Sequence, residues 1–491
     1  MRRLVLLLAL ATPALPQAPP PDATILRQAY TLLHPGLYRY NTSIGIDEDL
    51  NFLAAELANS TTTAQSYLAL SQFTAKIKCG HTYPNFFNQN KAVTAEVIEA
   101  GPRVPFYFLW LDKRTNVLEK EMVVTEDFTP NHALRAGTRI LDIDGHTSAD
   151  ILAKLMTIAR ADGSNDAKRI AQLAVTGEEQ YGAFDVYYPL FFSSTAKTIK
   201  LRIQRPYQPI ATLIVQPQTH ADRVAQWKAH HPSSNSSALF EWKRLPHNVA
   251  YLRMPTWAVY NSKWDWQTWL NQHLDEAADT NAAALIVDLR ENEGGNDVGD
   301  LILQRYVDHD LTLTGTHRLV RYRKVPDNLA PYLDTWDPSF KDWGKAAVDL
   351  PKPLPTAPPV TYYDLIRSSD KGSNILKPAS KRLHARLFIL TSATNSSATF
   401  NFAQTVQQNH LGTLVGAPTG GNQRGINGGA FFFLRLPNSH IEVDLPLIAT
   451  FPETPQPDQG LTPDRIVHTS ADDIANHRDP EMETVTQLLQ F

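Results

Sequence analysis

The sequence predicts a multidomain α/β protein, and three observations support this fold class. The chain has 491 residues, which is enough for about two to four domains. The runs Ala282–Arg290 and Leu387–Leu390 are almost continuously apolar, and each precedes a turn and then a helical pattern. Such runs are typical of strands buried on both faces of an α/β sheet. Upstream of these runs, the apolar residues before residue 78 recur at helical spacing.

The N-terminus has the pattern of a secretory signal. Met1–Arg3 is basic, Leu4–Leu10 is apolar, and small residues up to Ala18 offer cleavage sites. The apolar run is too short to span a bilayer, and no later run is longer. We therefore predict a signal peptide over residues 1–18, a secreted or periplasmic location, and no transmembrane span.

Residues 22–83 predict a helical N-terminal domain. Its apolar residues form three stripes at the spacing of helix faces. The pattern ends at Cys79–Pro84, where glycine and proline flank the single histidine His81. The stripes consist of Ile25, Ala29, Leu32 and Leu33, then Leu50, Leu53, Ala54 and Leu57, then Tyr67, Leu70, Phe73 and Ile77.

Residues 100–225 predict a β-rich domain. Ala136–Gly145 has the pattern of a strand with a tight turn, and a helix is expected from Ser148 to about Ile158. This stretch resembles the glycine-aspartate-glycine portion of a PDZ-like domain, which would bind an extended peptide by strand addition or only pack. Further strands are expected at Val104–Trp110, Glu121–Thr125 and Lys197–Ile203.

A polar linker, His230–Ser237, precedes a C-terminal α/β domain over residues 238–491. Within it, residues 318–382 are rich in Pro, Asp and Lys and have weak periodicity, so we predict an insertion or cap there. Strands return at Phe431–Leu436 and Ile441–Leu447, and a short helix ends the chain.

Composition and motifs exclude several classes of function. The net charge is −4 and no basic block stands out, so nucleic acid is not expected as a partner. Cys79 is the only cysteine, which rules out an intramolecular disulfide and a multi-cysteine zinc site, and we interpret it as a packing residue. The sequence has no H-E-x-x-H zinc motif and no phosphate-binding loop, so we predict no metal and no cofactor.

Two predicted turns contain the candidate catalytic residues. Small polar residues, Ser392–Ser397, lie between a predicted strand and a helix, where unpaired N–H groups favour negative charge on an acyl oxygen. The same residues would also serve simply as helix N-caps. In Asp288–Gly295 a buried strand ends in two glycines, which let the backbone approach a ligand and point N–H groups at an anion. An ordinary Gly-Gly turn that serves only the fold explains this sequence pattern equally well.

In this order, the motifs resemble the C-terminal processing (tail-specific) proteases, the tricorn core and the interphotoreceptor retinoid-binding-protein-like proteins. Asp288–Gly295 resembles their oxyanion motif, and Ser397–Gly421 resembles the nucleophile helix with its glycine-threonine-glycine segment. Gly80–Thr82 and Gly460–Asp464 are similar to two further family segments. The resemblance implies a Clp-protease/crotonase-like catalytic domain, together with the N-terminal helical bundle and the PDZ-like domain.

The resemblance also implies the roles of individual residues. The tail-specific branch uses a lysine as base, but that register falls here on Asn422, whose amide cannot accept a proton, so we do not expect a Ser-Lys dyad. The tricorn-like branch uses a histidine, and His81 occupies the matching segment, with an ordinary pKa suited to a general base. His81 could also simply bond carbonyls at a helix end. The implied site consists of Ser397 as nucleophile (Ser396 is the alternative), His81 as base, Gly294 or Gly295 with Ala398 as oxyanion donors, and Asp458 as the acidic residue that orients His81.

These observations predict an exported serine peptidase that hydrolyses peptides or unfolded protein tails through a Ser-His mechanism. The main alternative is a non-catalytic protein that binds a hydrophobic ligand or a peptide on the same scaffold. An α/β-hydrolase esterase is less well supported, because the sequence has no Gly-x-Ser-x-Gly elbow.

Overall fold

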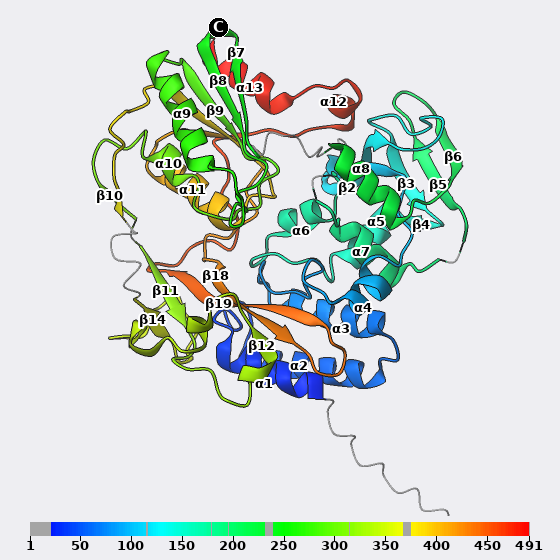
Figure 1. Cartoon of the computed structure of the whole chain (residues 1–491). Helices are drawn as coiled ribbons and strands as arrows, with labels where there is room; N and C mark the ends of the chain where they lie inside the picture. The colour runs from blue at the N-terminus through cyan, green and yellow to red at the C-terminus, as the bar shows by residue number, and fades with distance from the viewer. Residues whose placement is uncertain are drawn as a thin grey trace, which may run out of the picture.

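The computed structural model describes residues 21–490 apart from 114–115, 178, 195, 231–238, 314 and 367–374. The predicted signal peptide and the linker after His230 lie outside these residues. Figure 1 shows three groups of elements: N-terminal helices with a long β-hairpin, a β-rich part, and a sheet flanked by helices. No helix within the described residues is long and apolar enough to cross a membrane.

The N-terminal part is built from helices α1 (Pro21–Leu33), α2 (Ser43–Asn59) and α3 (Thr63–Lys76), followed by α4 (Lys91–Val93) and the π-helix η1 (Thr94–Ile98). Side chains at two N-caps explain where helices begin. Thr42 accepts a hydrogen bond from the N–H of Gly45, and Thr62 forms a reciprocal capping box with Gln65. Most residues of the three apolar stripes face a common core, whereas Leu32 is 46% exposed and lies outside it.

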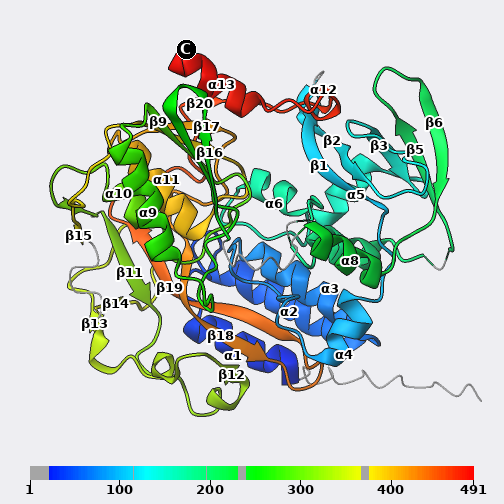
Figure 2. The same cartoon turned by 45° about the horizontal axis from the view of Figure 1, so that its top comes forward.

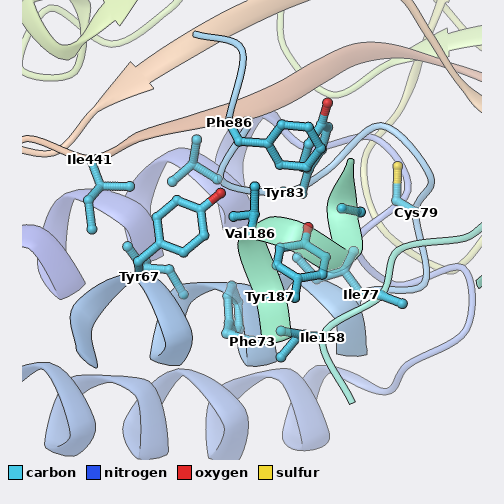
Figure 3. Packing of buried hydrophobic residues seen from close by; sticks show 14 of the residues in the cluster. Tyr67, Phe73, Ile77, Cys79, Tyr83, Phe86, Ile158, Val186, Tyr187 and Ile441 are labelled. Atoms are coloured by element: carbon cyan, nitrogen blue, oxygen red, sulfur yellow. The ribbon is translucent and has the colours of Figure 1, made fainter. Parts of the chain in front are cut away.

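The loop after α3, which carries His81, is anchored in that core. Figure 3 shows Cys79, Tyr83 and Phe86 of the loop packed among residues of α3 and of α7 (Ala183–Phe191). Tyr67 of α3 also donates a 2.5 Å hydrogen bond to the carbonyl of Pro84. These contacts hold the backbone on both sides of His81.

The β-rich part is a six-stranded sheet in which every described strand pair is antiparallel. Its order is β1-β2-β3-β5-β6, with β4 paired to β3. The turn Asp144–Gly145 after β3 adopts positive φ at both residues, and α5 begins at Ser148 as the sequence predicted. The PDZ-like assignment of this part stays a prediction. The elements are β1 (Phe106–Lys113), β2 (Asn116–Asp127), β3 (Arg139–Ile143), β4 (His146–Thr147), β5 (Ile199–Gln204), β6 (Ile210–Val215), α5 (Ser148–Leu155), α6 (Asp166–Gln172) and α8 (His220–His230).

A second six-stranded sheet has the order β20-β17-β16-β9-β8-β7, and all its neighbours are parallel except β7 and β8. Alternate residues of β9 explain its apolar run: Leu285 and Val287 share a core with α9, α10 and α11, while Ala284 and Ile286 share one with α13. Figure 2 shows α13 and α9–α11 on different sides of this sheet. The elements are β7 (Glu241–Leu245), β8 (Val249–Arg253), β9 (Ala284–Asp288), β16 (Arg386–Thr391), β17 (Thr413–Gly416), β20 (Arg465–Ile466), α9 (Trp266–Asp279), α10 (Asp300–Leu303), α11 (Ser397–Gln408), α12 (Ala471–Ala475) and α13 (Pro480–Leu489).

The third large sheet, of order β12-β18-β19-β11-β14-β13, is antiparallel and joins distant parts of the chain. The segment predicted as an insertion or cap, residues 318–382, supplies β12, β13 and β14 and most of β11. The hairpin of β18 and β19 shares its core with α1–α3 and runs along them in both views (Figures 1 and 2). The elements are β10 (Leu311–Thr312), β11 (Thr316–Val320), β12 (Leu333–Asp334), β13 (Ala347–Asp349), β14 (Tyr363–Leu365), β15 (Ile375–Leu376), β18 (Asn427–Arg435), β19 (Glu442–Pro452) and the 3₁₀ turns η2 (Pro246–Asn248), η3 (Ala330–Tyr332), η4 (Pro338–Lys341) and η5 (Gly344–Ala346).

Candidate functional site

The two adjacent serines at the start of α11 differ in what their hydroxyl groups do. Ser396 is buried, and its hydroxyl donates a 3.1 Å hydrogen bond to the carbonyl of Glu293. Ser397 is half-buried, has a left-handed φ of +51°, and makes no side-chain hydrogen bond to any residue that the structure describes. A non-glycine residue in this conformation is strained, and such strain is found at functional sites. Ser397 therefore presents the available hydroxyl.

The serine turn supplies the N-cap residue of α11 but no capping side chain. Ser396 occupies the N-cap position of α11 but makes no side-chain cap hydrogen bond. Asn395 instead donates to the carbonyls of Leu289 and Asn292. The first N–H groups of α11 thus keep their hydrogen-bonding capacity and the positive end of the helix dipole.

The Gly-Gly turn after β9 lies directly against Ser397. Gly294 has φ +127°, and a Cβ atom built on it would lie 2.9 Å from the Cβ of Ser397 and 3.1 Å from the backbone nitrogen of Ala398. No side chain fits between these groups. Asn292 fixes the turn, because its Nδ2 donates to the carbonyl of Met254 and its Oδ1 accepts from the N–H of Gly294.

The hydrogen bond from the N–H of Gly294 to Asn292 distinguishes Gly294 from Gly295 as a candidate oxyanion donor. The N–H of Gly294 already donates to Asn292 over 2.9 Å. The N–H groups of Gly295 and Ala398 make no hydrogen bond to the part of the chain that the structure describes. Gly295 has φ +138°, and a Cβ built on it would lie 2.2 Å from the backbone of Trp257, so only glycine fits. The geometry therefore favours Gly295 and Ala398 over Gly294 as donors to a developing negative charge.

His81 belongs to the loop that follows α3, and its ring lies 5.7 Å from the ring of Phe431, between centroids. A Cβ built on Gly428 would lie 3.9 Å from its Cε1 atom. Its Nδ1 is buried without a hydrogen-bond partner among the described residues. Burial lowers the pKa of His81, and Asp162 and Glu293 only partly offset this effect. The imidazole is therefore disposed to be neutral, which is the form that accepts a proton.

Glu293 connects the loop of His81 with the serine turn. Its carboxylate interacts electrostatically with His81, while its carbonyl accepts the hydroxyl of Ser396. The next residue, Gly294, contacts Ser397. His81 and Ser397 are far apart in the sequence yet flank the same turn. They are not hydrogen-bonded to each other here, which is common for proton-transfer partners in the absence of substrate.

Two basic residues from the α5–α6 region also reach this turn. Arg160 and Lys168 pair with Glu293 over 3.1 and 2.9 Å, and Lys168 also donates to the carbonyl of Thr394 over 2.8 Å. Burial raises the pKa of Glu293, but the two cations outweigh it and hold that pKa well below its ordinary value. In both views α6 lies between the parallel sheet and the β1–β6 sheet (Figures 1 and 2). Sequence reasoning missed these cations, because they belong to no motif.

Asp458 does not contact His81. Its Oδ1 accepts hydrogen bonds from Nδ2 of Asn422, over 2.7 Å, and from the N–H of Ser164, over 3.0 Å. Asn422 also donates to the carbonyl of Asp162 over 3.1 Å and is fully buried. The position that matches the lysine of the tail-specific branch thus holds an amide, which hydrogen-bonds to two loops. Cys79 is buried and its pKa is raised to about 11, so its thiol stays protonated.

The described residues contain no group of three or more His, Cys, Asp or Glu side chains that could hold a metal ion. The arrangement around Ser397 instead combines a hydroxyl, an imidazole and unpaired N–H groups. These are the groups that acyl transfer requires.

Comparisons with known proteins agree with this chemistry. Residues 248–464 match the model of peptidase family S41. The chain is similar to mature CPAF complexed with lactacystin, with 14% identity, a TM-score of 0.60, and coverage of 95% of this chain and 96% of that one. A second structure of mature CPAF gives 13% identity, a TM-score of 0.60 and 95% coverage of both chains. At this identity the likeness shows a shared fold.

A further solved structure, the photosystem II D1 C-terminal processing protease, is 14% identical and covers 91% of this chain and 92% of its own, with a TM-score of 0.39. No curated protein matches the chain. The family match spans β8, β9, α11 and the Gly-Gly turn, which are the elements that hold the candidate site. Residues 248–464 are therefore similar to peptidase family S41, in agreement with the resemblance to the C-terminal processing proteases that the motifs predicted.

Proposed function

We propose that the protein is an exported serine peptidase in which Ser397 is the nucleophile and His81 the general base. One chain of contacts carries the proposal. Arg160 donates to the carbonyl of Gly80, next to His81, and pairs with Glu293, whose neighbour Gly294 lies against Ser397. These contacts support a site in which the hydroxyl of Ser397, the imidazole of His81 and free N–H groups act together at this turn. The export follows only from the signal-like residues 1–18.

The proposed reaction follows the logic of other serine peptidases. Ser397 attacks the scissile carbonyl while His81 takes its proton. The N–H groups of Gly295 and Ala398 stabilise the resulting oxyanion, and each such donor contributes roughly 2.7–4 kcal/mol. His81 then gives the proton to the leaving amine, and a water molecule, activated by His81, hydrolyses the acyl-enzyme.

The proposed substrates are peptides or unfolded protein tails. An extended chain suits a site that lies between a helix terminus and the loop of His81, since a folded domain would not present a peptide bond to a half-buried serine. Strand addition to the β1–β6 sheet remains the proposed role of the PDZ-like part.

The activity test uses the purified protein and an unfolded protein substrate. We expect the wild type to release new peptide termini, measured by mass spectrometry, and Ser397→Ala and His81→Ala to release none above background. Circular dichroism confirms that the variants are folded. Cleavage that persists in folded Ser397→Ala would overturn the proposal, and a folded wild type that binds peptides without cleaving them would favour the binding-protein alternative.

A further inference from the structure

Asp162, between α5 and α6, faces the residue that precedes His81. The aspartate is only 2% exposed, and neither a motif nor the family resemblance singled it out. Its Oδ1 accepts a 3.0 Å hydrogen bond from the N–H of Gly80. The carboxylate therefore holds the backbone of the histidine loop directly.

The absence of a side chain at Gly80 makes this contact possible. A Cβ built on Gly80 would lie 2.8 Å from Oδ2 of Asp162, so the carboxylate fills the space that a side chain would need. Two further hydrogen bonds tie the same segments together. The N–H of Gly163 donates to the carbonyl of Lys78 over 2.9 Å, and Arg160 donates to the carbonyl of Gly80.

The other carboxylates near His81 are committed elsewhere. Glu293 pairs with Arg160 and Lys168, and Asp458 accepts from Asn422 and Ser164. Oδ2 of Asp162 has no hydrogen bond to the described part of the chain. Asp162 is thus the carboxylate best placed to favour positive charge on the imidazole.

We propose that Asp162, and not Asp458, is the positioning residue of His81. It holds the Gly80–His81 peptide in place and stabilises the imidazolium that forms when Ser397 gives up its proton. This inference rests on the proposed function, because the imidazolium is an intermediate of that reaction. Asp458 bonds neither His81 nor Asp162: its Oδ1 accepts from Nδ2 of Asn422, which also donates to the carbonyl of Asp162.

The charged groups around His81 define how the proposal is tested. Asp162 and Glu293 raise the pKa of His81, while Arg160 and Lys168 lower it. Asp162→Asn keeps an oxygen for the N–H of Gly80 but removes one of the two favourable charges. It should therefore lower the pKa of His81 while leaving the loop in place. Asp458→Asn is the matched control, because it also removes a carboxylate.

The experiment titrates His81 by NMR in the full chain, with the resonance assigned from His81→Gln. We expect its midpoint to fall by roughly one pH unit in Asp162→Asn and to stay unchanged in Asp458→Asn. In parallel, kcat/KM of Asp162→Asn should fall by roughly 10²-fold, with its acid limb moved to lower pH, because general-base catalysis contributes about 10²–10⁴-fold.

Each result bears on one proposal separately. An unchanged His81 midpoint in Asp162→Asn, or an equal shift in Asp458→Asn, overturns the role of Asp162 even if the protein cleaves peptides. If the His81 midpoints are as expected but the protein cleaves no peptide, Asp162 remains the charge partner of His81. That result overturns the peptidase mechanism instead. Asp162→Glu adds a check on folding, since it restores the charge in a longer side chain and should recover part of the wild-type midpoint.

Discussion

At the scale of single residues, the site depends on which polar groups are occupied. Ser396 and Gly294 look as suitable as their neighbours in the sequence, but each already makes a hydrogen bond within the fold. Ser397 and Gly295 keep these groups free, and Ser397 is also less buried than Ser396 and has a left-handed φ. Sequence spacing locates such a turn to within one residue, whereas the choice between adjacent residues depends on backbone direction.

The pH dependence of activity is a prediction at this scale. Burial lowers the pKa of His81 below its ordinary value of about 6.5, and a general base works only when deprotonated. The acid limb of kcat/KM should therefore have its midpoint below pH 6.5, because the base stays free as the pH falls. Initial rates on a peptide substrate between pH 4 and 9 check this. A midpoint above pH 7 would contradict the assignment of His81.

At the scale of elements, the local patterns identified the strands and turns that hold the serine. The apolar runs of β9 and β16 were predictable because both faces of each strand are buried, one against α9–α11 and the other against α13. Strands β12–β14 could not be predicted, because their segment has weak periodicity and pairs with β18 and β11, distant in sequence. Sequence analysis also did not identify Arg160, Asp162 and Lys168, because only tertiary contacts bring them to the site.

The Gly-Gly turn offers a prediction with an internal control. In Gly295→Ala the new Cβ would lie 2.2 Å from the backbone of Trp257, so the turn must move and its N–H leave its position. We expect kcat to fall by roughly 10²–10³-fold, the loss typical of one oxyanion donor.

Gly145→Ala is the control, because Gly145 has φ +91° and nothing within 4 Å of a built Cβ. It should lose only about 1–2 kcal/mol of stability to the left-handed backbone and keep its kcat. Chemical denaturation and initial rates separate the two effects. Equal activities in the two variants would remove Gly295 from the proposed oxyanion site.

At the scale of the whole molecule, the proposed site draws its residues from regions with separate local structure. The helical part supplies His81, the α5–α6 region supplies Arg160, Asp162 and Lys168, and the parallel sheet supplies the turn and Ser397. The resemblance to a known family anticipated the first and last of these. The hairpin of β18 and β19 packs on α1–α3 and also contacts His81 through Phe431.

The buried carboxylate of Asp444 in β19 makes the stability of this assembly depend on pH. Burial raises its pKa to about 7, and Glu442 adds to the effect, while hydrogen bonds from Asn85 and Asn88 oppose it. The folded state then binds more protons than the unfolded chain between about pH 4 and 7. The contribution of Asp444 to the free energy of unfolding therefore falls as the pH rises through that range, by up to roughly 1.4 kcal/mol per pH unit.

Asp444→Asn mimics the protonated side chain and should remove that part of the pH dependence. We expect the free energy of unfolding of the variant, relative to the wild type, to increase from pH 4 to pH 7. Urea denaturation at several pH values measures this difference. A difference that stays constant over the range would show that Asp444 does not titrate as inferred.

The central claim, that His81 activates Ser397, is tested most directly by a covalent serine probe. The purified protein is treated with a fluorophosphonate, which reacts with activated serines, and the adduct is mapped by mass spectrometry. The account predicts a single adduct on Ser397 that is retained in Ser396→Ala and lost in folded His81→Ala. An adduct on Ser396, or labelling of Ser397 that is undiminished in His81→Ala, would contradict it.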